Sequence, residues 1–224
     1  MGSEMCIRDR LEIIVLPLIQ GIAEFLPISS SGHLVIAEAV LGQPPNSTYN
    51  ILLHGGTLAS ILIFYHRKIL DLLRQDRRVI PLLIVGTLPA AMIGIAIKLS
   101  FEEVLEKPLV AACLLPVTGL VVWWSNRRPD GEETYRHLTF RKTLLIGLFQ
   151  SFALLPGLSR SGLTIAAGLS LGLRRDQATT FSFLLAIPAI LGAMVLGCKD
   201  FLTGAAAPVT VEQIIGTVIA AIVG

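Results

Sequence analysis

The chain has 224 residues and a formal net charge of +2 at neutral pH. Hydrophobic residues make up 53% of it and charged residues 15%, and the mean hydropathy is +0.73. These values exclude an ordinary soluble domain and are typical of a chain that lies mainly in a lipid bilayer. The Lys and Arg residues cluster between apolar runs and form no single basic face, so nucleic acid is not an expected partner.

Apolar runs follow one another along the whole chain. They lie at 11–26, 33–41, 50–65, 79–97, 108–125, 143–155, 162–172, 180–197 and 210–224. A bilayer crossing needs about 20 apolar residues, or ~17 at minimum. Two runs, 79–97 and 108–125, qualify as crossings, and 50–65 and 180–197 are near the limit. The runs 11–26 and 143–155 are each followed closely by a shorter run. We therefore predict an all-α polytopic membrane protein that contains two broken hairpins.

The first broken hairpin carries polar groups that lipid does not tolerate. The segment Glu-Phe-Leu-Pro-Ile-Ser-Ser-Ser-Gly-His-Leu at 24–34 places a carboxylate, three serines and a histidine between two apolar runs. Polar groups at membrane depth are tolerated where they line a cavity inside the protein. We predict a re-entrant hairpin over 11–41 with such a cavity at its turn. Gly32, like Gly162 later in the chain, is predicted to be a turn former.

Basic residues predict the orientation of the chain. They cluster in the segments 67–78 and 127–142, whereas 42–49 carries no charge. By the positive-inside rule, the two basic segments lie in the cytoplasm and 42–49 lies on the opposite side of the membrane.

A second polar hairpin repeats the first at an offset of about 130 residues. Segment 18–37 aligns without a gap with 148–167, and the identical pairs include Gln20 with Gln150, Ser29 with Ser159, Ser31 with Ser161, and Gly32 with Gly162. Such self-similarity is typical of inverted-repeat transporters. Each unit contains one hairpin and three crossings, an odd number, so the second copy is predicted to lie upside down relative to the first.

The repeat predicts how the chain is divided. Residues 1–10 resemble neither a signal peptide nor an amphipathic anchor, and we interpret them as a non-native leader. The first repeat covers 11–125, a cytoplasmic linker covers 126–142, and the second repeat covers 143–224 with its re-entrant hairpin at 143–172. The equivalent of 108–125 would fall beyond the last residue, so the second repeat is predicted to be truncated at its C-terminus.

The turns of the two hairpins are predicted to meet near the membrane midplane and to form an anion site. In each, a short second half-helix begins after the serines, and its free N–H groups and positive dipole end favour phosphate. Arg160 adds a planar fork of donors, which is costly at membrane depth without an anionic ligand or partner. Glu24 is its expected protein partner, and a purely structural ion pair between the hairpins stays open.

Two residues of the first hairpin are candidates for a metal site. Gln20 and Glu24 are four residues apart and therefore lie on one helical face. Their oxygens suit a hard divalent cation, Mg²⁺ or Ca²⁺, with phosphate supplying the other ligands.

These motifs resemble those of the bacitracin-resistance family of undecaprenyl-diphosphate phosphatases. The resemblance rests on Gln20-x-x-x-Glu24, on Phe-Leu-Pro-Ile-Ser-Ser-Ser-Gly-His at 25–33 and on Pro-Gly-Leu-Ser-Arg-Ser-Gly-Leu-Thr at 156–164. Phe-Ser-Phe-Leu-Leu-Ala-Ile-Pro at 181–188 is similar to the segment that follows the second motif in that family. The resemblance covers nearly the whole of 11–224. Gln20 is the less acidic option of the family's (Glu/Gln)xxxGlu motif, which leaves Glu24 as its only carboxylate.

The resemblance implies hydrolysis of undecaprenyl diphosphate in the bilayer at the extracytoplasmic face of the bacterial plasma membrane. This reaction recycles the lipid carrier for peptidoglycan synthesis and confers bacitracin resistance. Ser30 is then the candidate nucleophile and His33 its general base and later acid, beside Glu24 and Arg160. The implied phosphate ligands are Ser29, Ser31, Ser159, Ser161, Gly162 and Thr164. A homodimer is compatible with the sequence.

Three alternatives stay open from the sequence. Water could attack the phosphate directly, with Ser30 only a ligand, and His33 could be a hydrogen-bonded packing residue. A transporter or flippase of an anionic or lipid-phosphate substrate would share the broken helices and the inverted repeat. The combination of a nucleophile, a base and an Arg favours the phosphatase, because a transporter needs binding groups alone.

Overall fold

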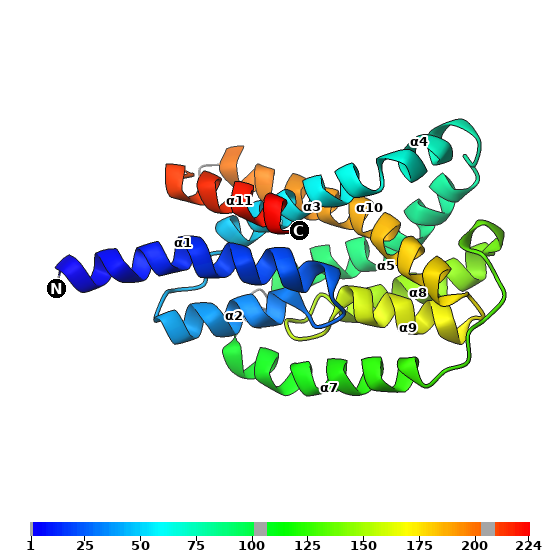
Figure 1. The fold of residues 1–224 in the computed structure, drawn as a ribbon, viewed down its shortest axis with the longest axis horizontal. Helices are drawn as coiled ribbons and strands as arrows, with labels where there is room; N and C mark the ends of the chain where they lie inside the picture. Colours follow the sequence, from blue (N-terminus) through cyan, green and yellow to red (C-terminus); the bar gives the residue numbers. More distant parts are fainter. Residues whose placement is uncertain (1, 101–106, 203–208) are drawn as a thin grey trace.

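The computed structural model describes the backbone of residues 2–100, 107–202 and 209–224, and the side chains of 12–97, 107–197 and 209–224. Within these ranges the regular structure is a bundle of helices (Figure 1). In chain order they are α1 (Gly2–Phe25), α2 (Ser30–Leu41), α3 (Ser47–Phe64), α4 (His66–Arg74), α5 (Val79–Ser100), α7 (Pro108–Asn126), the 3₁₀ helix η1 (Tyr135–His137), α8 (Phe140–Phe152), α9 (Arg160–Ser170), α10 (Arg175–Leu202) and α11 (Val211–Val223). The prediction of an all-α fold is confirmed for the described residues.

Three of the described helices are long and apolar enough to cross a membrane. These candidate spans are Val79–Ile97 in α5, Pro108–Asn126 in α7 and Arg175–Gly197 in α10. They coincide with the predicted runs 79–97, 108–125 and 180–197. The prediction of a polytopic membrane protein is therefore confirmed, because more than one helix of the chain qualifies as a crossing.

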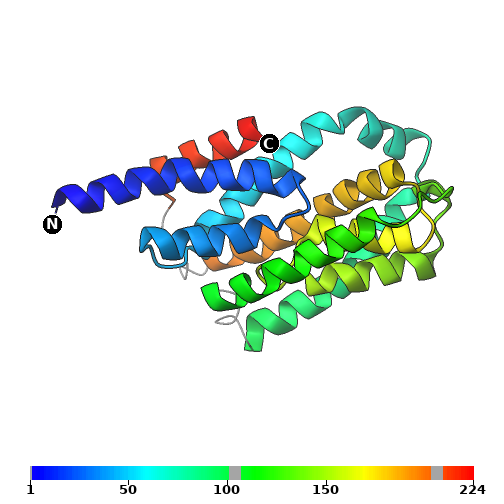
Figure 2. The same cartoon turned by 60° about the horizontal axis from the view of Figure 1, so that its bottom comes forward.

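The two broken hairpins approach each other from opposite ends of the bundle. Figure 1 shows the α1–α2 hairpin and the α8–α9 hairpin lying along the long axis, with their turns side by side near the middle. Contacts between the turns agree with this view, since the Ser161 hydroxyl donates to the Leu26 carbonyl at 3.3 Å. Helix α7 packs on both α2 and α9 and so lies across the two hairpins (Figure 2).

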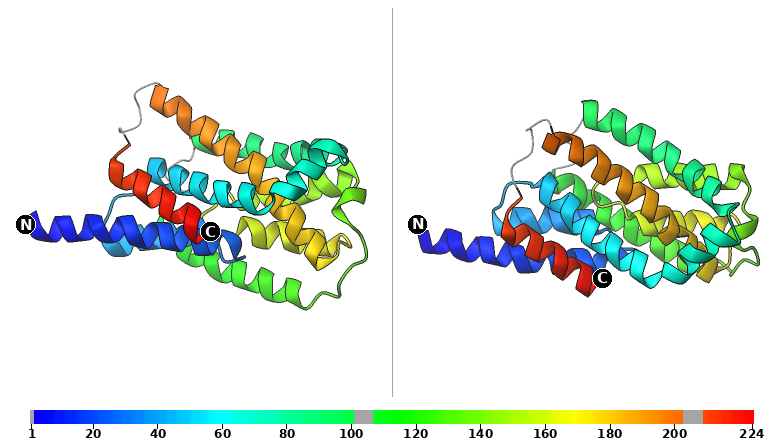
Figure 3. Two further views of the ribbon diagram at one scale, coloured as in Figure 1. Left: turned by 45° about the horizontal axis from the view of Figure 1, so that its top comes forward. Right: turned by 90° about the horizontal axis from the view of Figure 1, so that it is seen from above.

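Several of the other helix–helix contacts occur in matching pairs. Helix α1 packs on α11 and α8 packs on α5, while α3 packs on α11 and α10 packs on α5. Figure 3 shows α11 beside both α1 and α3. Helices α3 and α10 also pack on each other. Adding about 130 to the residue numbers of α1, α3 and α5 leads to α8, α10 and α11, so the contacts of α1 and α3 with α11 have counterparts in the contacts of α8 and α10 with α5.

Apolar cores hold the second hairpin and the helices around it in place. The largest cluster includes Leu82, Ile146, Leu173, Phe181 and Leu184, whose side chains are all buried. Residues from α5, α8 and α10 meet in this cluster, and burial of such side chains stabilises each by about 1.5–3 kcal/mol. The packing of α8 against α5, and of α9 against α10, therefore holds both helices of the α8–α9 hairpin in place.

Several predicted boundaries differ from the structure. The basic segment after α3 contains a helix, α4, because Ile69 and Leu72 lie on one face and pack against the apolar cores. The predicted linker 126–142 includes η1 and the start of α8, because the Thr139 side chain accepts a hydrogen bond from the Lys142 amide and caps that helix. Residues 2–10, interpreted as a leader, continue α1 in the same helix.

Candidate active site

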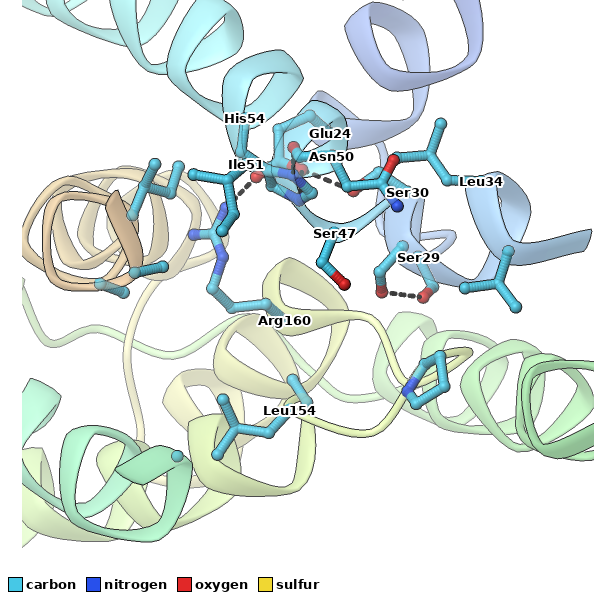
Figure 4. Close-up of a pocket in the computed structure, with 18 of the residues that line it drawn as sticks. Glu24, Ser29, Ser30, Leu34, Ser47, Asn50, Ile51, His54, Leu154 and Arg160 are labelled. Carbon is cyan, nitrogen blue, oxygen red and sulfur yellow. Dashed lines mark hydrogen bonds and ion pairs between the residues drawn. The ribbon is translucent and has the colours of Figure 1, made fainter. Parts of the chain in front are cut away.

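A cavity of about 510 Å³ lies where the two hairpin turns meet α3, α5 and α10 (Figure 4). Seven of the predicted site residues line it: Glu24, Ser29, Ser30, Ser31, Ser159, Arg160 and Ser161. They come from positions far apart in the chain, and Figure 4 shows the Arg160 side chain from one hairpin pointing toward Glu24 of the other. The cavity therefore brings both motifs into one site.

Serine side chains determine where the two inner half-helices begin. The Ser29 hydroxyl accepts a hydrogen bond from the Gly32 amide at 3.3 Å, and the Ser159 hydroxyl accepts one from the Gly162 amide at 3.1 Å. Each serine thus caps its helix by occupying one of the amides that a helix start leaves without a partner. Both helix N-termini point their positive dipole ends at the region between the turns.

Two glycines allow the turns to touch. A Cβ atom added at Gly32 would lie 2.6 Å from the Cα of Gly157, which leaves no room for a side chain. Gly157 itself has a φ of 96°, a left-handed conformation that glycine adopts without strain. The prediction that Gly32 and Gly162 form turns is wrong, because both lie in the first turn of a helix, where close packing requires a small residue.

We expect Gly32→Ala to lower the free energy of unfolding by about 1–3 kcal/mol, because the added methyl group overpacks the contact between the two turns. The measurement is chemical unfolding of the purified protein in detergent. Gly119→Ala is the matched control, since a Cβ atom there meets nothing within 4 Å. Equal stability of both variants would contradict the close contact.

An ion pair joins the two hairpins at the cavity. Arg160 donates to Glu24 Oε1 at 2.5 Å, and the side chains are only 17% and 5% exposed. Glu24 lies at the C-terminal end of α1 and Arg160 at the N-terminal end of α9, and each helix dipole disfavours the charge placed there. The pair offsets both effects, while the N-terminal end of α9 and Arg160 remain jointly attractive to an anion.

The Glu24 carboxylate is also the acceptor for a candidate nucleophile. The Ser30 hydroxyl donates to Glu24 Oε2 at 2.6 Å, and the Gln20 amide donates to the same oxygen at 3.2 Å. A short hydrogen bond from a hydroxyl to a carboxylate is the arrangement in which the carboxylate can take the hydroxyl proton. Glu24 therefore lies in the position that the sequence assigned to His33.

Gln20 is buried and does not line the cavity among the described side chains. His33, Gly162 and Thr164 also lie outside the set of described residues that line it. His33 Nδ1 is 2.8 Å from the Ser29 carbonyl oxygen, at a turn where Ser29 has a φ of 70°. Thr164 is buried and bonds to the Arg160 carbonyl and to the Ser182 hydroxyl. His33, Gly162 and Thr164 hold the backbone of the two motifs, and their part in the chemistry stays a prediction.

A second histidine reaches the site from α3. His54 lines the cavity, its Nε2 lies 3.7 Å from Glu24 Oε2, and its Nδ1 lies 2.7 Å from the Asn50 carbonyl oxygen. Our interpretation of the sequence missed it. A signal was present, because Ser47, Asn50, His54 and Thr57 follow a spacing of three, four and three residues and form a polar stripe on an otherwise apolar helix.

Oxygen donors for a cation are present but few. Among the described residues, Gln20 Oε1 and Asn50 Oδ1 are buried without a hydrogen-bond partner, and Glu24 supplies a carboxylate. Among the described residues there is no group of three His, Cys, Asp or Glu side chains that could hold a metal ion. The donor set fits a cation that shares its ligands with a bound phosphate better than one held by the protein alone.

Comparison with known proteins gives a consistent result. The model of the family "Bacitracin resistance protein BacA" matches residues 13–224. A protein of Rhodopirellula baltica named undecaprenyl-diphosphatase is 50% identical, over 97% of this chain and 86% of its own length. Proteins of the same name are 42% identical in Carboxydothermus hydrogenoformans (86% and 75%) and 38% in Methanosphaera stadtmanae (94% and 85%). The chain therefore belongs to the bacitracin resistance protein BacA family.

Proposed function

We propose that the chain hydrolyses undecaprenyl diphosphate to undecaprenyl phosphate and inorganic phosphate, which returns the lipid carrier to cell-wall synthesis and confers resistance to bacitracin. The proposal rests on one observation. On the wall of one cavity, the Ser30 hydroxyl donates to the Glu24 carboxylate, which also pairs with the Arg160 guanidinium. The names of the relatives support the same reaction.

The positive groups of the site are suited to a diphosphate. Arg160 and the N-terminal ends of α2 and α9 face the cavity, and phosphoryl transfer depends mainly on positioning and charge neutralisation. A diphosphate that enters competes with Glu24 for the guanidinium.

The hydrogen bond between Ser30 and Glu24 supports attack by the serine. In the first step the Ser30 hydroxyl oxygen bonds to the terminal phosphorus, its proton passes to Glu24, and the bond from that phosphorus to the bridging oxygen breaks. Undecaprenyl phosphate leaves with the bridging oxygen. In the second step the oxygen of a water molecule bonds to the phosphorus of the phosphoserine and the bond from that phosphorus to the Ser30 oxygen breaks. Glu24 returns its proton to the Ser30 oxygen, and inorganic phosphate leaves with the oxygen and protons of the water.

A divalent cation, Mg²⁺ or Ca²⁺, is part of the proposal. Glu24 and Gln20 would hold it, and the buried Gln20 Oε1 without a partner supports this assignment. When bound, such an ion neutralises charge on the phosphate oxygens.

The same proposal includes how the helices are arranged in the membrane and to which side the active site opens. Helices α2, α8 and α9 have 12, 13 and 11 residues, fewer than the ~17 that a crossing needs, which supports two re-entrant hairpins in an inverted repeat. The matched helix contacts of the two halves support the repeat. Pro45 and Ser47, within the uncharged segment 42–49, line the cavity. This supports an active site that opens toward the extracytoplasmic face of a plasma membrane.

We expect the purified full chain to release inorganic phosphate from undecaprenyl diphosphate in detergent when Mg²⁺ or Ca²⁺ is present, and to stop when a chelator removes the ion. The measurement is a phosphate-release assay, and restoring the cation should restore the rate. Release that persists in chelator would remove the cation from the proposal. A folded chain that binds the substrate but releases no phosphate would favour the transporter instead.

A further inference from the structure

A second cavity, apolar and smaller, lies between α5 and α8. Its volume is about 410 Å³, and apart from Ser151 it is lined by hydrophobic residues: Ile93, Ile97, Leu145, Leu148, Phe149, Phe152 and Leu155. We call it the α5–α8 groove. The side chains of Ile93, Leu148 and Phe152 are each about half exposed. In a membrane protein such an open apolar groove faces the lipid chains.

The groove begins where the two helices separate. A Cβ atom added at Gly147 would lie 2.4 Å from the Gly86 carbonyl oxygen, so α5 and α8 are in backbone contact at that point. Small residues permit this close approach between helices in a membrane. Toward the C-terminal end of both helices the larger side chains of Ile93 and Phe152 keep them apart, and the groove forms between them.

The groove adjoins the candidate active site. Ile97 lines both cavities, and the neighbours Leu154 and Leu155 line one each. Gly94 lies at the junction: it lines the active-site cavity, and a Cβ atom there would be 3.7 Å from the Leu154 side chain. The absence of a side chain at Gly94 keeps the passage between the two cavities wide.

The wall of the active-site cavity is polar near the hairpin turns and apolar near α5 and α10. The charged and hydroxyl groups come from the hairpin turns, from Glu38 on α2 and from α3, whereas α5 and α10 contribute apolar groups such as Ile97, Ile190 and Ala193. A molecule with an anionic end and an apolar tail would therefore place its phosphates at the turns and direct its tail toward α5. The α5–α8 groove is the apolar space that adjoins this wall.

We infer that the α5–α8 groove binds the isoprene units that follow the diphosphate of the polyprenyl substrate. The inference rests on the proposed function, because it takes the tail of that substrate as the occupant. Gly94 and Ile97 then control whether a long tail can extend from the active-site cavity into the α5–α8 groove. A short prenyl chain needs the hairpin turns for its diphosphate but makes little use of the groove.

The test compares two substrates in Leu148→Trp, whose larger side chain fills the α5–α8 groove at a residue that does not line the active-site cavity among the described side chains. We expect kcat/KM for undecaprenyl diphosphate to fall by about tenfold or more, because two or three methylene-sized parts of the tail lose their place. For geranyl diphosphate kcat/KM should change less than about twofold, which would also show that the variant is folded. Gly119→Trp on α7, where an added Cβ atom meets nothing within 4 Å, is the matched control.

Equal losses for both substrates, or no loss for either, would overturn the inference. A photoreactive prenyl phosphate, with a benzophenone close to the phosphate, tests the groove without turnover. We expect the probe to label residues 143–155. Undecaprenyl phosphate should compete with the probe for this site and reduce the labelling. Labelling confined to α7 or α10 would overturn the inference. If the wild type hydrolyses neither diphosphate and yet is labelled in the groove, the proposed function fails and the tail site stands.

Discussion

Replacing Arg160 with Ala is expected to lower kcat/KM for undecaprenyl diphosphate by about a thousandfold or more, because Arg160 is the charged donor between the two helix N-termini at the cavity. The loss has a second cause: without the guanidinium, the buried Glu24 carboxylate loses its ion pair with Arg160 and keeps the hydrogen bonds from Ser30 and Gln20. The measurement is phosphate release at several substrate concentrations. Arg160→Lys should recover only part of the rate, because an ammonium group does not bind two oxygens in one plane.

Arg174→Ala is the matched control for this variant. Arg174 is half exposed, and its side chain pairs with Asp176 at 3.1 Å at the far end of α9 from the turn. We expect its rate to stay within about twofold of wild type, since an exposed pair contributes little to stability. A near-normal rate in Arg160→Ala would refute the assignment of the site.

Replacing Glu24 with Gln should have the second-largest effect. The carboxylate accepts the Ser30 hydroxyl and pairs with Arg160, so the neutral amide removes both the base and the counter-charge. We expect a loss of turnover of about a thousandfold. We also expect the free energy of unfolding to fall by about 3–5 kcal/mol, because Arg160 is left buried without its partner. Phosphate release and chemical unfolding in detergent measure the two effects separately.

The combined double variant Glu24→Gln/Arg160→Ala separates the two roles of Glu24. Removing both charges should recover part of the stability that Glu24→Gln loses, without any recovery of turnover. Glu132→Gln, at an exposed position outside the site, is the control for loss of a carboxylate. If Glu24→Gln kept normal turnover, Ser30 would need another base, and His33 and His54 would be the residues to replace next.

Much of the site followed from the sequence because it consists of short motifs. The serines at 29 and 159 cap helices that begin next to them, and capping is a local interaction that spans three residues. The membrane spans in α5, α7 and α10 followed from the length of the apolar runs. Arg160 and Glu24 could be paired in advance because both would be costly at membrane depth without a partner.

Other features depend on contacts between distant parts of the chain. Gly32 was expected to form a turn, and only its approach to Gly157 shows that it is a packing position inside a helix. His54 belongs to the site because α3 packs against α1, which places Nε2 near Glu24. Hydrogen bonding to Ser30 likewise identifies Glu24 as the nearest base.

The sequence by itself determined the helical fold, the membrane setting, the two polar hairpins and the pairing of their charges. Each of these follows from local composition, from spacing along a helix or from the cost of a buried charge. The tertiary structure alone decided the neighbours: which hydroxyl bonds to which carboxylate, which glycines touch, and where an apolar groove adjoins the cavity. Such contacts arise from the packing of whole helices, and no single segment of the chain contains them.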